Sequence, residues 1–365
     1  MTSDNKLENE LAPVREKIDA IDDKLIALIN QRAKLVLDAA QLKRQSGQDV
    51  HFYRPEREAQ QLRRIEQKNP GPIEKQGLLQ VFRELISACL ALEKKHSIAY
   101  LGPEGTFTQA AVLRHFGGSV NPRAFSGIDQ VFREVAANSC DYGVVPVENS
   151  IEGVVNHTLD MFITSDLTIC GEVHLRIHQN LLSLATDLQN INTVYSHTLS
   201  FAQCRQWLDN NLPKVECIHV NSNAEAARLA KADNSTAAIA GQMAASVYEL
   251  NILAENIEDD PDNTTRFLVI GNEPVPPSGA DKTSVLFAMP SKPGSLVKLL
   301  GCFADNKVNL SRIESRPSRQ AMWEYVFFVD LEGHQQDAAI GTALEQLRQS
   351  ASMVKVLGSY PVASL

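Results

Sequence analysis

Apolar residues in the first 45 positions recur at alternating spacings of three and four, as they do along one face of a helix. The pattern runs from Leu11 to Leu42, and only Arg32 interrupts it. It predicts a helix of about 50 Å over residues 11–45, with Pro13 in the first turn, where proline is tolerated. Further helices are expected over residues 55–68 and 73–95. Helices of such unequal length cannot bury the long apolar face, so the pattern favours a dimer in which two long helices pair.

Strands and helices alternate over residues 97–274, which predicts an α/β domain with mainly parallel sheets. Strands over residues 98–101, 142–147 and 193–195 each run into polar or glycine-rich residues and then a helix. We expect two lobes, the first made of residues 97–175 and 251–274, the second of residues 176–250. Ligands of such folds bind at the carboxyl ends of strands, which here face the junction of the lobes.

A proline-rich stretch at residues 273–279 precedes the last predicted domain, residues 281–365. Its pattern is strand, helix, strand, strand, helix, strand. This βαββαβ order is typical of a ferredoxin-like fold.

Composition narrows the class of protein. The chain has 365 residues, a net charge of −9, 44% hydrophobic and 22% charged residues, typical of a water-soluble protein of two or three domains. The negative charge argues against nucleic acid or an anionic membrane as a partner. We expect no membrane span and no signal peptide, and the six scattered cysteines suggest free thiols and a cytoplasmic location. Neither a nucleotide-binding loop nor metal-ligand spacing is present, so we expect no cofactor and no metal.

Two cations stand out on the first helix. Arg32 interrupts the apolar face, and Lys43 follows eleven residues later, which at about 100° per residue places both on one side. A cation there is costly unless an anion meets it. The alternative is an arginine that reaches solvent or pairs with a carboxylate.

Residues 11–95 resemble the all-helical chorismate mutase family. The match rests on residues 14–18, Arg32, Lys43, residues 55–57 and Glu93. The resemblance implies an intertwined dimer. In each site, Arg32 of one chain and Arg15 of the other chain bind the carboxylates of chorismate. It also implies that Lys43 and Glu93 form hydrogen bonds with the ether oxygen and that Glu56 binds the ring hydroxyl. Better-known members carry an aspartate and an arginine that this chain lacks. Arg54 or Arg57 is expected to replace them, and Cys89 to line the pocket.

Residues 97–271 resemble prephenate dehydratase, a family with two lobes like those of periplasmic binding proteins. The matching segments are residues 100–107, 145–150, 195–197 and 264–267. The resemblance implies that Thr265 is the catalytic hydroxyl. The other expected contacts of prephenate are Gly105, Thr106, Asn149, Ser196, Gln203, Thr264 and Arg266. A threonine hydroxyl is too weak an acid to protonate the leaving group alone, so water or an acid such as Glu148 is expected to do so.

The C-terminal part resembles the phenylalanine-binding ACT domain. Two segments carry the resemblance and are the expected effector site: Gly294, Ser295, Leu296 and Val297, then Glu314, Ser315, Arg316 and Pro317. Ser295 stands where alanine is common. The alternative is a plain dimerisation domain.

Taken in order, the three resemblances predict a bifunctional chorismate mutase–prephenate dehydratase that acts on chorismate and prephenate as a homodimer or larger oligomer and is inhibited by phenylalanine. Two alternatives remain at this point. One is a non-catalytic amino-acid sensor, against which Arg32 and Lys43 argue, because a sensor needs no cationic helical pocket. The other is a dehydratase that prefers arogenate.

Overall fold

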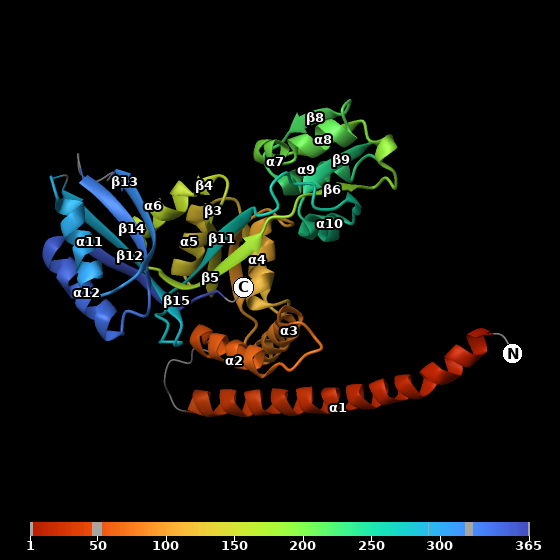
Figure 1. The fold of residues 1–365 in the computed structure, drawn as a ribbon, viewed down its shortest axis with the longest axis horizontal. Helices are drawn as coiled ribbons and strands as arrows, with labels where there is room; N and C mark the ends of the chain where they lie inside the picture. The colour runs from red at the N-terminus through yellow and green to blue at the C-terminus, as the bar shows by residue number, and fades with distance from the viewer. Residues whose placement is uncertain (1–2, 46–52, 291, 318–323, 364–365) are drawn as a thin grey trace.

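The computed structural model describes residues 3–45, 53–290, 292–317 and 324–363. They form an N-terminal helical part, a two-lobed α/β domain and a C-terminal module (Figure 1).

The helical part contains α1 (Ser3–Gln45), α2 (Pro55–Lys68) and α3 (Lys75–Glu93). The helix α1 begins earlier than predicted, so Pro13 lies inside it and the expected place in the first turn was wrong. At 1.5 Å per residue α1 is about 65 Å long. In Figure 1 it is a rod whose N-terminal half extends away from the rest of the chain. Leu62, Ile65, Leu79 and Ile86 form the core between α2 and α3.

The apolar face of α1 is not covered within one chain. Six of its residues have between 49% and 63% of their surface exposed: Val14, Ile18, Ile21, Leu25, Leu28 and Leu35. Only the C-terminal end of the helix is buried by its neighbours, as at Ala40. An exposed apolar face of this extent indicates an interaction surface.

The first lobe is built on a sheet of order β2-β1-β3-β11-β5, with β4 paired to β3. Its elements are β1 (Ser97–Leu101), α4 (Phe107–Phe116), β2 (Asn121–Phe125), α5 (Ile128–Ala136), β3 (Tyr142–Asn149), β4 (Gly153–Val154), α6 (Asn156–Thr164), β5 (Thr168–Arg176) and β11 (Thr264–Gly271).

The second lobe has a sheet of order β10-β6-β9-β7-β8. Its elements are β6 (Asn180–Ser183), the 3₁₀ helix η1 (Leu188–Asn190), β7 (Thr193–Ser196), α7 (Thr198–Gln203), α8 (Arg205–Asn211), β8 (Glu216–His219), α9 (Asn223–Ala230), β9 (Thr236–Ala240), α10 (Gln242–Tyr248) and β10 (Asn251–Ala254).

Two expectations about these lobes were wrong. The sheets are mixed, not mainly parallel: β1 runs parallel to β2 and β3, whereas β11 is antiparallel to both β3 and β5. The chain returns from the second lobe in the opposite direction and inserts β11 between two existing strands. The return also begins later than residue 251, because β10 pairs with β6 in the second lobe.

The C-terminal module has the predicted βαββαβ order. Its elements are β12 (Asp281–Pro290), α11 (Ser295–Asp305), β13 (Leu310–Pro317), β14 (Glu324–Glu332), α12 (Ala338–Ser350) and β15 (Met353–Pro361). The antiparallel sheet has the order β13-β14-β12-β15, and α11 and α12 pack against one face of it.

The other face of this sheet packs against the first lobe. Leu286, Phe328 and Tyr360 share one apolar core with Phe132 and Phe162 of the lobe. At Gly358, where φ is +152°, an added Cβ would lie 2.3 Å from the Ile169 carbonyl oxygen, so only glycine permits this approach. The module and the first lobe therefore pack together through a shared apolar core.

Three general features bear on the class of protein. Within the described part of the chain, no helix is both long and apolar enough to cross a membrane. The same residues contain no cluster of three or more metal-ligating side chains. All six cysteines are free thiols, as expected.

Candidate active sites

A cavity of about 660 Å³ lies between α1, α2 and α3. Its charged lining consists of Arg32, Lys43, Arg54, Arg57, Glu58, Arg64 and Glu93, and Cys89 contributes to its apolar part. Cations outnumber carboxylates, so the cavity suits an anionic ligand. The structure thus brings together Arg32, Lys43, Arg54, Cys89 and Glu93, as the sequence predicted.

Two buried atoms in this cavity have no hydrogen-bond partner among the described residues. They are Arg32 Nη1 and Glu93 Oε2. Glu93 Oε2 forms an ion pair with Lys43 Nζ at 3.9 Å, and the Glu93 side chain is only 3% exposed. A buried polar atom without a partner costs about 1–3 kcal/mol. The cavity is therefore arranged to receive polar atoms of a ligand.

The expectation for Glu56 was wrong. Glu56 is buried outside the cavity lining, and its Oε1 accepts a hydrogen bond from Arg54 Nε at 2.6 Å. Two residues along a helix turn the side chain by about 200°, so Glu58 lines the cavity instead. Burial raises the pKa of Glu58 to about 7, against the opposing charge of Arg83. Glu58 lies three residues before Gln61, which also lines the cavity, whereas Glu56 lies five residues before it, and this spacing was the sequence signal that favours Glu58.

Arg15 does not line this cavity. It lies on the exposed part of α1, where its Nη1 is 2.5 Å from Glu8 Oε1. Within one chain the arginine therefore has no contact with the site it was expected to serve.

The second site is centred on Asn149, at the end of β3, and Thr265, at the start of β11, which face each other in register. Asn149 Nδ2 donates to Thr265 Oγ1 at 2.8 Å and to Asn263 Oδ1 at 2.7 Å. Asn149 Oδ1 accepts from the backbone N–H groups of Ile151 and Glu152, both at 3.0 Å. One amide therefore orients the Thr265 hydroxyl and the loop after β3.

A carboxylate of that loop joins the two lobes. Gln203 Nε2 in the second lobe donates to Glu152 Oε1 in the first at 3.0 Å, and Gln179 Nε2 donates to Gln203 Oε1 at 3.2 Å. Partial burial raises the pKa of Glu152, although His197 and the hydrogen bond from Gln203 oppose it. The sequence reasoning did not single out Glu152. Its position three residues after Asn149, in the loop between two paired strands, was the available signal.

Other expected prephenate contacts are engaged elsewhere. Ser196 is fully buried, and its Oγ donates to Ile239 O at 3.1 Å. Thr106 caps α4, and the Gly105 N–H donates to Gln109 Oε1 at 2.6 Å. The Thr264 hydroxyl donates to Asp262 O at 3.2 Å. In this structure each of these four residues is held by a hydrogen bond within the protein.

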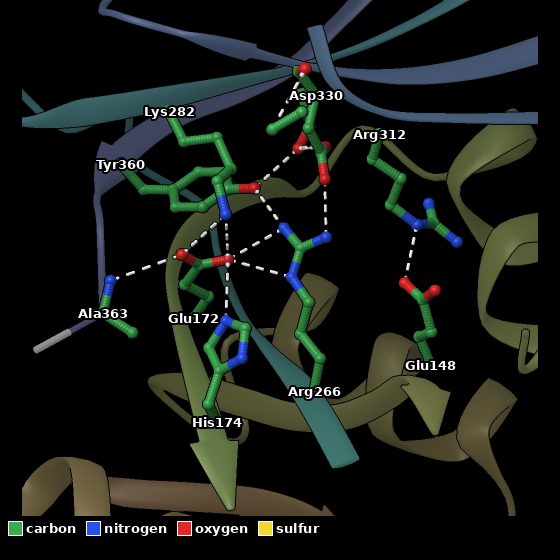
Figure 2. Close-up of polar contacts among 11 residues, drawn as sticks. Glu148, Glu172, His174, Arg266, Lys282, Arg312, Asp330, Tyr360 and Ala363 are labelled. Carbon is green, nitrogen blue, oxygen red and sulfur yellow. Dashed lines mark hydrogen bonds and ion pairs between the residues drawn. The ribbon is translucent and has the colours of Figure 1, made fainter. Parts of the chain in front are cut away.

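The roles expected for Arg266 and Glu148 were wrong. Successive side chains of a strand point to opposite faces of its sheet. Arg266 therefore points away from Thr265 and forms ion pairs with Glu172 and Asp330 (Figure 2). Glu148, paired in register with Arg266, contacts Arg312 at 2.7 Å.

The two expected effector segments lie at different places in the C-terminal module. Gly294, with φ of +79°, precedes α11, and Val297 is 75% exposed. Residues 314–317 belong to the edge strand β13, where Arg316 pairs with Asp160 at 2.7 Å. No hydrogen bond or ion pair between described residues joins the two segments.

Comparison with known proteins agrees with this division of the chain. Residues 14–94 match the family model of chorismate mutase type II, residues 98–275 that of prephenate dehydratase, and residues 283–349 that of the ACT domain. The fold and the two sites thus define a multidomain enzyme with a mutase part, a dehydratase part and an ACT module.

Full-length relatives have the same arrangement. The bifunctional chorismate mutase/prephenate dehydratase of Pseudomonas aeruginosa is 53% identical over 98% of this chain and 99% of that protein. The protein of the same description from Aquifex aeolicus is 47% identical over the same shares. The chain belongs to the family of bifunctional chorismate mutase/prephenate dehydratases. This membership identifies an enzyme and rules out the non-catalytic sensor.

A solved structure supports the fold of the last two parts. The prephenate dehydratase of Arthrobacter aurescens in complex with L-Phe is 35% identical, with a TM-score of 0.68, and the match covers 73% of this chain and 89% of that one.

Proposed function

We propose that the chain rearranges chorismate to prephenate in the helical cavity and converts prephenate to phenylpyruvate at the junction of the two lobes. The observation that carries the first activity is the cationic cavity in which Arg32 and Glu93 have buried atoms that lack a hydrogen-bond partner among the described residues. The observation that carries the second is the Asn149–Thr265 pair beside the lobe-joining Glu152.

In the cavity the chemistry needs no nucleophile. Chorismate is a dianion that rearranges through a pericyclic transition state, so the protein contributes by holding a compact conformer and stabilising charge on the breaking ether oxygen. Arg32 binds a carboxylate, and Lys43 and Glu93 form hydrogen bonds with the ether oxygen. We assign the ring hydroxyl to Glu58, which lines the cavity where Glu56 does not.

A second copy of the chain completes the cavity. The uncovered apolar face of α1 supports a dimer in which two long helices pair. In that dimer the partner's Arg15 would supply the second carboxylate contact, which explains why Arg15 lies outside the cavity of its own chain.

At the lobe junction the reaction releases CO₂ and water and makes the ring aromatic. Thr265 donates a hydrogen bond to the departing hydroxyl. Glu152 supplies the proton, because it is the carboxyl beside Asn149 and its pKa is raised by burial. Glu148 cannot serve, since it lies on the other face of the sheet.

The C-terminal module binds phenylalanine and reduces dehydratase activity. The complex of the Arthrobacter protein with L-Phe and the ACT match support this role. We also assign the chain to the cytoplasm, where six free cysteines are stable.

The test is to incubate the purified chain with chorismate and follow chorismate, prephenate and phenylpyruvate over time, with and without phenylalanine. We expect prephenate to appear first and phenylpyruvate to follow, more slowly when phenylalanine is present. Chorismate that is not consumed would refute the mutase role, and prephenate that accumulates unchanged would refute the dehydratase role. Comparing kcat/KM for prephenate and arogenate decides between the two dehydratase substrates.

A further inference from the structure

The residue pair next to Asn149 and Thr265 on β3 and β11 is joined by ion pairs to the C-terminal module. Asn149 faces Thr265 across β3 and β11, and the neighbouring pair in register is Glu148 and Arg266. Because side chains alternate along a strand, the first pair faces the lobe junction and the second pair faces the C-terminal module. Figure 2 shows Glu148 and Arg266 pointing toward strands of that module.

Arg266 forms the first attachment. Its Nη1 is 2.5 Å from Asp330 Oδ2 on β14, and its Nη2 donates to the Tyr360 hydroxyl on β15 at 3.0 Å. Its Nε donates to Glu172 Oε2 on β5 at 2.9 Å. Only 10% of the Arg266 side chain is exposed, so these contacts are weakly screened by solvent.

The surrounding charges balance. Lys282 Nζ on β12 lies 2.9 Å from both oxygens of Glu172. Burial alone would raise the pKa of Glu172, but the hydrogen bond from His174 and the charges of Arg266 and Lys282 outweigh it and lower that pKa well below its usual range. Each side of the boundary supplies one cation and one anion. Separating the two sides would leave buried charges with fewer partners, which is strongly unfavourable.

Arg312 forms the second attachment. Its Nε donates to Glu148 Oε2 at 2.7 Å, and only 13% of its side chain is exposed. Arg312 lies on β13, two residues before Glu314. Farther along the same strand, Arg316 pairs with Asp160 on α6 at 2.7 Å. The edge strand that carries one expected effector segment therefore contacts the first lobe at two points.

We propose that the C-terminal module sets the geometry of the Asn149–Thr265 pair through two anchors, Arg266–Asp330 and Glu148–Arg312. Glu148 and Arg266 are positioning residues: they do not touch the substrate, and they act through the residues next to them in the chain. This inference rests on the proposed role of Thr265. It adds that a ligand which displaces β13 also displaces Arg312 and, through Glu148, the end of β3 that holds Asn149.

The test is the Arg312→Met substitution in the full chain, which removes the charge and keeps most of the side-chain volume. Since small misplacements of reacting groups are costly, we expect the dehydratase kcat to fall about tenfold or more, with a smaller change in KM. The ratio of dehydratase rates without and with saturating phenylalanine should move toward 1. Phenylalanine binding measured by calorimetry and the chorismate mutase rate should stay at wild-type values.

Two matched variants control for general damage. Arg348→Met makes the same change at an exposed arginine of α12 that pairs with Glu345, and it should behave as wild type in every assay. Arg312→Lys keeps a cation and should recover part of both the kcat and the phenylalanine response. If Arg312→Met loses mutase activity as well, Glu148→Gln removes the same ion pair from the other side and replaces it in the test.

The possible outcomes distinguish failure of the anchors from failure of the proposed dehydratase function. An Arg312→Met or Glu148→Gln protein that folds, binds phenylalanine and keeps wild-type kcat and inhibition refutes the Glu148–Arg312 anchor and the proposed route through β13. Wild-type protein that leaves prephenate unchanged in the same assay refutes the proposed dehydratase function and, with it, the anchors.

Discussion

The two candidate sites differ in how their polar atoms are satisfied. In the helical cavity, Arg32 Nη1 and Glu93 Oε2 are buried and have no hydrogen-bond partner among the described residues. At the lobe junction, Thr265, Asn149, Glu152 and Gln203 are hydrogen-bonded to one another. A fixed arrangement of charge suits a rearrangement that needs no proton transfer. A network that bridges two lobes suits a reaction in which a substrate must enter between them and receive a proton.

The comparison predicts that Arg32→Ala has the largest effect and affects one site only. Loss of a buried charged partner costs about 3–5 kcal/mol, which corresponds to a loss of mutase kcat/KM of roughly a hundredfold to several thousandfold. Dehydratase activity on added prephenate should remain. The control is Lys34→Ala, an exposed cation of the same helix, which should leave both rates unchanged. Equal loss of both activities in soluble Arg32→Ala protein would contradict two separate sites.

Removing the Thr265 hydroxyl at the lobe junction should reduce dehydratase activity and leave mutase activity intact. Thr265→Val keeps the volume and should lower the dehydratase kcat by about 10²-fold, the usual loss for one donor to a developing oxyanion. Thr265→Ser keeps the hydroxyl and should retain most of the activity. Chorismate consumption should be unaffected in both. A Thr265→Val enzyme with wild-type dehydratase kcat would show that the hydroxyl has no catalytic role.

Because only the lobe-junction site uses a proton donor, the pH dependence of dehydratase kcat should differ from that of mutase kcat. Because burial raises the pKa of Glu152, its protonated form persists above the usual range of a glutamate. Dehydratase kcat should therefore fall as pH rises through this raised pKa. Glu152→Gln should lower kcat by about 10²-fold, a typical general-acid contribution, and its pH profile should lose that decline. Coincident profiles for the two proteins would assign the proton to another group.

The smallest expected effect concerns stability at the helical cavity. The pKa of Glu58 is about 7 in the folded chain, against 4.5 for an ordinary solvent-exposed glutamate. The folded chain thus binds the extra proton between these values, and the associated stability is present below pH 4.5 and lost as pH rises through 7. Glu58→Gln should gain Tm relative to wild type between pH 5 and pH 8, by about 2–4 °C for each kcal/mol. Exposed Glu74→Gln serves as the control, and a constant Tm difference would contradict the raised pKa.

Local pattern was sufficient for most elements of this fold. Pro55 at the start and the turn residues 69–72 at the end predicted α2 at its observed bounds, and alternation of strand and helix predicted the βαββαβ module. Helical spacing also placed Arg32 and Lys43 on one side of α1, where both line the cavity. These are properties of residues near one another in sequence, because helix and strand geometry repeats over a few positions.

The tertiary structure alone decided which face each polar residue serves. Thr265 and Arg266 are adjacent in sequence, yet they point to opposite sides of β11, and only the packing of the C-terminal sheet shows that Arg266 meets Asp330. Glu56 and Glu58 are likewise close in sequence and separate on α2. The physical reason is that a motif specifies residue type and spacing, whereas burial and charge pairing depend on segments far apart in sequence, 64 positions for Arg266 and Asp330, that only folding brings together.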